Sequence, residues 1–98
     1  MKIIAYDHFK PGVTKDSVKP DLLKEEIRHA WQLQKAGVVR EFYGRADAPG
    51  GVLVFECASV DEVKGYVAAF PFSKAGLLEW DFLLLTAPLA FEVLFAAA

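Results

Sequence analysis

The residues with the clearest chemical potential lie in a helical pattern between residues 21 and 36. Its apolar positions share one sector of the helix, at about 100° per residue: Leu22, Leu23, Ile27, Ala30 and Leu33. Glu26 lies inside that sector, where a carboxylate is costly unless it is paired or lines a cavity. Burial would raise its pKa toward the range useful for proton transfer. Glu26 is predicted to be a general acid or base; the alternative is a carboxylate at the edge of the stripe, paired with an arginine.

His29 follows Glu26 by three residues, at the margin of the same sector. We expect it to assist Glu26 in proton transfer, and a solvated helix histidine is the alternative. The same spacing is half of a carboxylate-bridged di-iron pattern, but the sequence holds no second half. The single cysteine, Cys57, supplies neither a disulfide nor a thiolate cluster. No metal site is therefore predicted.

A second pair of candidates lies on the strand predicted over residues 38–45. Strand alternation places Tyr43 and Arg45 on one face, two residues apart. The two N–H donors of an arginine guanidinium and a phenol hydroxyl could together bind a substrate carboxylate. The alternative is that Arg45 pairs with Asp47 to rigidify the turn, while Tyr43 is mostly core.

Composition excludes several classes of function. The 98 residues allow one domain, over 1–98, and 54% of them are hydrophobic, which excludes intrinsic disorder. The net charge of -2, with no run of Lys or Arg, argues against nucleic acid as a partner. No apolar run is long enough to span a bilayer and no signal-peptide pattern opens the chain, so we expect a cytoplasmic protein without a membrane partner. No glycine-rich loop opens a helix, so a nucleotide cofactor has no support.

The predicted elements have the order β-α-β-β-α-β. Strands are expected over residues 3–9, 38–45, 51–57 and 79–86, and helices over 21–36 and 60–70, with a loop over 72–76. This order predicts an α+β fold, the ferredoxin-like plait, with an antiparallel sheet and two helices on one face. The other sheet face and the surplus of aromatic residues (13%) require a cover, which predicts a homodimer. The apolar residues Phe91, Val93 and Phe95 are expected to pack on the neighbouring subunit.

Several short segments, taken together, resemble one family over nearly the whole chain. They are Trp31–Gly37, Arg40–Tyr43, Arg45–Gly50, Phe70–Phe72 and Gly76–Leu78. In their order and spacing the chain resembles the muconolactone isomerase-like members of the dimeric α/β-barrel superfamily. The resemblance implies a homodimer whose two sheets face each other as a barrel, and cofactor-free chemistry on a small carboxylated lactone.

Two functions follow as hypotheses. The first is a cofactor-independent enzyme that transfers a proton on a small anionic, lactone-like molecule, in a pocket between the first helix and the sheet. There Glu26 would be the acid or base, His29 its auxiliary, and Tyr43 with Arg45 the anchor. The alternative is a non-catalytic small-molecule binding or assembly module with the same dimeric barrel. A cavity beside Glu26 favours the first, and a solidly packed helix–sheet interface favours the second.

Overall fold

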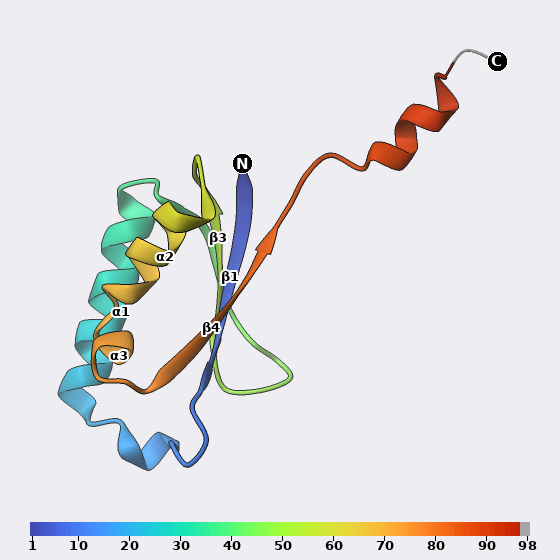
Figure 1. The fold of residues 1–98 in the computed structure, drawn as a ribbon. Coiled ribbons are helices and arrows are strands. Elements are labelled where there is room, and N and C mark those ends of the chain that lie inside the picture. Colours follow the sequence, from blue (N-terminus) through green and yellow to red (C-terminus); the bar gives the residue numbers. More distant parts are fainter. Residues whose placement is uncertain (97–98) are drawn as a thin grey trace.

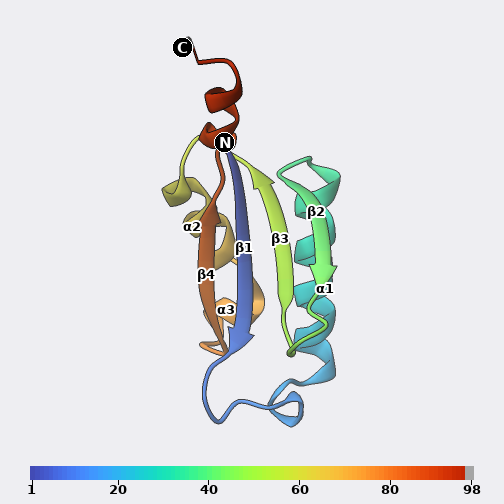
Figure 2. The same ribbon diagram turned by 90° about the vertical axis from the view of Figure 1, so that its right-hand side faces the viewer.

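A four-stranded antiparallel sheet carries helices on one of its faces (Figure 1). The computed structural model describes residues 1–96. The elements, in chain order, are β1 Lys2–Phe9, η1 Lys15–Ser17, α1 Pro20–Lys35, β2 Val39–Gly44, β3 Gly51–Glu56, α2 Val60–Ala68, α3 Pro71–Lys74, β4 Leu78–Leu84 and η2 Leu89–Leu94, where η marks a 3-10 helix. The strand order β2-β3-β1-β4, seen face-on in Figure 2, is that of the ferredoxin-like plait. The predicted fold class is confirmed.

The helix boundaries follow local signals in the sequence. Pro20 occupies the first turn of α1, where its missing N–H costs nothing, and Gly37 follows the helix with a φ of 78° that favours glycine. At the start of α2 the Ser59 hydroxyl accepts a hydrogen bond from the N–H of Glu62 at 3.3 Å. The Glu62 carboxylate in turn accepts one from the N–H of Ala58 at 3.1 Å. Side chains thus satisfy backbone donors that this helix start would otherwise leave unpaired.

The loop predicted over residues 72–76 is wrong in part, because residues 71–74 form the one-turn helix α3. Pro71 fixes the helical φ at its first position, and the helix buries the ring of Phe72. Its backbone lies beside α1, and the N–H of Phe72 points at that helix. The turn therefore contributes a hydrogen-bond donor to the site described below.

The core lies between the sheet and the helices. Ile3 and Ala5 of β1 are fully buried there, opposite Phe55 and Leu53 of β3. Val63 and Val67 of α2 pack against these residues from the helix side. Val39, Cys57 and Phe70 belong to the same hydrophobic core. Because side chains alternate along a strand, the next inward position of β1 after Ala5 is Asp7. A charged residue therefore continues the core face of the central strand.

The opposite sheet face carries no helix among the described residues (Figure 1). Strand registers place an apolar middle on this open face: Ile4, Tyr6, Val52, Val54 and Leu83. Beyond β4 the chain leaves the body, and η2 projects away from the sheet (Figures 1 and 2). Its Phe91, Val93 and Phe95 are 64%, 75% and 84% exposed. No helix within residues 1–96 combines the length and apolar character that crossing a bilayer needs.

Candidate functional site

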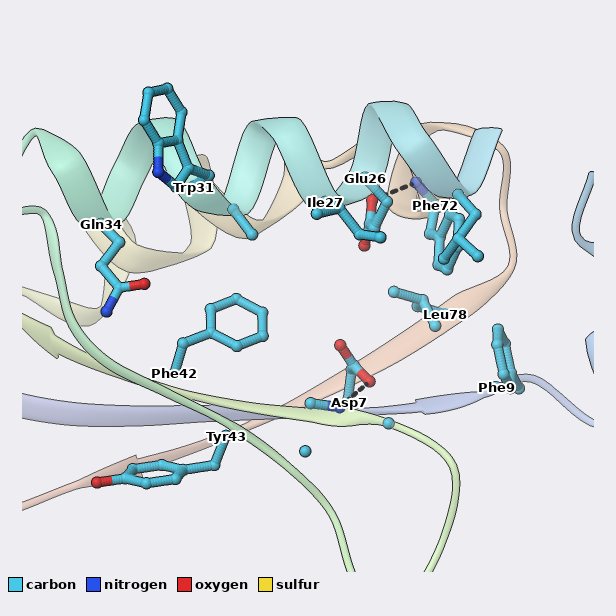
Figure 3. A pocket seen from close by; sticks show the side chains of 15 residues that line it. Asp7, Phe9, Glu26, Ile27, Trp31, Gln34, Phe42, Tyr43, Phe72 and Leu78 are labelled. Atoms are coloured by element: carbon cyan, nitrogen blue, oxygen red, sulfur yellow. Dashed lines mark hydrogen bonds between the residues drawn. The ribbon is translucent and has the colours of Figure 1, made fainter. Parts of the chain in front are cut away.

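A cavity of about 560 Å³ lies between α1 and the sheet, beside the edge strand β2 (Figure 3). Most of its walls are apolar: the helix contributes Ile27 and Trp31, and the sheet contributes Phe42. Two carboxyl side chains interrupt these walls, Asp7 from β1 and Glu26 from α1, and Figure 3 shows them pointing toward one another. A mostly apolar hollow with a few convergent polar groups is typical of small-molecule sites.

Glu26 lies on the helix side of this cavity. Its Oε1 accepts a hydrogen bond from the N–H of Phe72 at 3.0 Å, so α3 fixes the orientation of the carboxyl. Burial and the nearby charge of Asp7 raise the pKa of Glu26 to about 7, against the smaller opposing effect of the Phe72 N–H. Among residues 1–96 no arginine forms an ion pair with it, and Arg28 on the same helix bonds to Glu25 instead. Glu26 can therefore exist in both protonation states near neutral pH.

Asp7 faces Glu26 from the sheet, and sequence reasoning missed it. It is 7% exposed, and its Oδ1 accepts a hydrogen bond from the N–H of Gly51 at 2.9 Å. Burial raises the pKa of Asp7, while the Gly51 N–H and the charge of Arg45 oppose the rise. The available signal was the alternation of Ile3, Ala5 and Asp7, which places the aspartate on the core side of β1.

The backbone of the β2–β3 hairpin packs closely against Asp7. Gly50 has a φ of 152°, and a Cβ added there would lie 2.3 Å from the carbonyl oxygen of Asp7. Only glycine fits this approach, and it brings the N–H of the next residue, Gly51, to the Asp7 carboxyl. The glycine pair thus positions the aspartate, and both glycines also line the cavity.

Arg45 lies outside the cavity lining. Its guanidinium bonds to both carboxylate oxygens of Asp47, at 3.0 and 2.8 Å, and to the carbonyl oxygen of Asp7 at 3.1 Å. It also lies 5.7 Å from the ring centre of Tyr6, which belongs to the open sheet face. Of the two sequence-based interpretations of Arg45, the structure shows the ion pair with Asp47.

Tyr43 borders the cavity, but its ring points to the other side of β2 from Phe42 (Figure 3). Its hydroxyl donates a hydrogen bond to Glu41 at 2.6 Å, and the residue is 53% exposed. The structure therefore keeps Tyr43 and Arg45 near each other but does not bring them to the carboxyl of Glu26.

His29 also lies outside the cavity lining. Its ring packs edge-on against Phe70, with the ring centres 4.5 Å apart. Its Nε2 is buried, and no hydrogen-bond partner for it lies within residues 1–96. Burial and the charge of Lys74 lower the pKa of His29. The ring is therefore held mainly in its neutral form among core residues. Glu26 and Asp7 are the two carboxyl groups that the cavity brings together.

The described residues contain no group of three or more His, Cys, Asp or Glu side chains placed to hold a metal ion. Within the cavity, the two carboxyl groups can take up and release protons, so the arrangement is suited to acid–base chemistry.

Comparison with known proteins gives a structural relative and no relative by sequence. No protein-family model and no curated protein matches the chain. One similar solved structure is the 5-chloro-2-hydroxyhydroquinone dehydrochlorinase TftG from Burkholderia phenoliruptrix AC1100, in complex with 2,5-dihydroxybenzoquinone. The TM-score is 0.67 at 23% sequence identity, over 90% of this chain and 96% of that chain. This likeness shows the fold.

Proposed function

We propose that the protein is a cofactor-independent enzyme that transfers a proton on a small cyclic organic molecule, with Glu26 as general acid or base. The observation that carries the proposal is the carboxyl of Glu26 in an apolar cavity, with a pKa of about 7. A group that titrates near the working pH exchanges protons most effectively in both directions. The name of TftG supports the proposal, since a chain of this fold acts on a small ring compound.

The muconolactone isomerase-like identity is part of the same proposal for the cofactor-free proton transfer, but the expected site changes and the substrate is no longer required to be an anion. The anionic lactone predicted from the sequence needs an anchor, and Arg45 and Tyr43 were its candidates. Arg45 and His29 lie outside the cavity lining, so neither contacts the substrate in this proposal. Glu26, which lines the cavity, carries out the acid–base role. Lactones remain in the range of rings that the cavity volume accepts.

The experiment that tests this function does not require the natural substrate. Small cyclic ketones, lactones and hydroxylated rings are incubated with the protein in D₂O, and NMR follows the exchange of their carbon-bound protons. We expect exchange with at least one compound, at a rate that rises with pH through about 7 as the carboxyl of Glu26 ionises. Compounds that bind in the cavity without any exchange would instead support the binding-module alternative.

We also propose a homodimer in which the open sheet face meets a second copy. Its support is the apolar middle of that face, together with the exposed side chains of η2. Exposed apolar patches of this kind mark interfaces between proteins.

Deleting the chain from Phe91 onward should weaken this dimer, because it removes Phe91, Val93 and Phe95 from the contact with the neighbouring subunit. We expect the dimer dissociation constant, measured by analytical ultracentrifugation, to rise by about tenfold or more. A chain that sediments as a monomer at micromolar concentration contradicts the dimer, and an unchanged constant contradicts the role of the tail.

A further inference from the structure

Asp7 has one carboxylate oxygen that accepts no hydrogen bond from residues 1–96. The side chain is the most deeply buried charged group of residues 1–96, and its Oδ1 is occupied by the N–H of Gly51. No hydrogen bond from the described residues reaches Oδ2. Figure 3 shows the carboxyl directed across the cavity toward α1. Oδ2 is open to the cavity, so it can accept a hydrogen bond from a donor on a bound ligand.

The charge of the lining restricts what that ligand can be. Asp7 and Glu26 both face the cavity, and no Lys, Arg or His side chain of the described residues lines it. Arg45 acts on the Asp7 carboxyl through its charge, but it lies outside the lining, where it donates to the main-chain oxygen of Asp7 and pairs with Asp47. A bound carboxylate would therefore meet negative charge without a compensating cation, which costs affinity in a site of low polarity.

We propose that the substrate is an uncharged ring bearing a hydroxyl group, which donates its hydrogen bond to Oδ2 of Asp7, and that Asp7 excludes carboxylate anions from the cavity. This inference rests on the proposed function, because the bound ring is the one that exchanges a proton with Glu26. The aromatic side chains of Phe9, Phe42 and Phe72 in the walls fit the faces of such a ring (Figure 3).

The proton-transfer role of Glu26 also favours a hydroxyl over an ammonium group as the ligand's hydrogen-bond donor to Asp7. An ammonium ion held between the two carboxyls would favour the ionised form of each. The pKa of Glu26 would then fall, and a carboxylate of lower pKa is a weaker base toward a carbon-bound proton of the ring. An uncharged hydroxyl satisfies Oδ2 of Asp7 and leaves Glu26 free to titrate.

A matched pair of probes tests the inference: resorcinol, and 3-hydroxybenzoate, in which a carboxylate replaces one hydroxyl. Binding near neutral pH is followed by NMR on the indole N–H of Trp31, which lines the cavity. The indole of Trp80, which donates to Ser73 at 2.8 Å and lies outside the cavity lining, reports any effect elsewhere. We expect resorcinol to bind about tenfold or more tightly than 3-hydroxybenzoate, as expected for exclusion of a like charge.

The variant Asp7→Asn isolates the charge. Asparagine keeps an acceptor for the N–H of Gly51 and replaces the free oxygen with an amide donor, so the preference for resorcinol should fall by about tenfold. Asp16→Asn removes the same charge from an exposed position before α1 and should leave the preference unchanged.

Three outcomes with the wild-type protein overturn the inference: 3-hydroxybenzoate binds as tightly as resorcinol, 3-hydroxybenzylamine binds more tightly than resorcinol, or neither member of the pair binds at millimolar concentration. An unchanged preference in folded Asp7→Asn does the same. The comparisons within wild type decide the matter even where that variant fails to fold. None of these results bears on the proton exchange by Glu26, because the D₂O assay measures that exchange separately.

Discussion

Replacing Glu26 with glutamine should abolish proton exchange while leaving the fold intact. The amide keeps an oxygen that can accept the Phe72 N–H, but it cannot take up or release a proton at neutral pH. Loss of a positioned acid or base lowers a rate by about 10²- to 10⁴-fold. The D₂O assay measures the change, with Glu25→Gln as the matched control, since Glu25 is an exposed neighbour on the same helix.

The same variant has a predicted effect on stability. The pKa of Glu26 is raised from 4.5 to about 7 on folding, so the folded protein binds more protons than the unfolded chain between these values. The stability of wild type should therefore fall as pH rises from about 4.5 to about 7. Glutamine removes this loss, and we expect Glu26→Gln to be more stable by about 1–2 kcal/mol above pH 7, after allowance for solvent screening.

Thermal unfolding at several pH values checks the prediction. A large loss of stability in Glu26→Gln would show that the carboxyl is a structural partner and would refute its functional assignment. Full proton exchange by the variant would refute it as well.

Replacing Gly50 with alanine should cost the most stability of any small change near the site. The new Cβ would lie 2.3 Å from the carbonyl oxygen of Asp7, at a φ of 152° that side chains rarely adopt. The backbone of the hairpin or of β1 must move to relieve the clash. We therefore expect a loss of about 3 kcal/mol or more in the free energy of unfolding. The hairpin would also withdraw the N–H of Gly51 from Asp7.

Gly51→Ala provides the matched control, because a Cβ there has its nearest neighbour at 3.6 Å, an ordinary contact. Urea unfolding of the two variants measures the difference. Equal losses in Gly50→Ala and Gly51→Ala would contradict the close approach of the hairpin to Asp7.

Periodicity in the sequence was enough to predict the fold and the position of Glu26. Helical spacing over residues 21–36 and the order of strands and helices predicted the plait. Periodicity could not predict α3, because a four-residue helix is too short to show a repeat. Asp7 was predictable from the alternation of Ile3 and Ala5 along β1, which places the aspartate on the core side of the strand.

The location of Tyr43 and Arg45 depended on a feature that sequence alternation cannot show. Val39 pairs with Phe55 on the core face, and simple alternation would carry that face on to residues 41, 43 and 45. A bulge between Val39 and Glu41 shifts the register, so Glu41 pairs with Val54 on the open face. A single inserted residue thus turns the side chains of the rest of β2 to the opposite face of the sheet.

Direct titration of the Glu26 carboxyl is the measurement that tests the account most closely. Protein labelled with ¹³C in its glutamate side chains is titrated by NMR, and Glu26→Gln identifies the resonance. We predict a midpoint at about pH 7 for Glu26. A midpoint near 4.5, the ordinary value for a glutamate, would contradict the claim that this cavity holds an acid–base group.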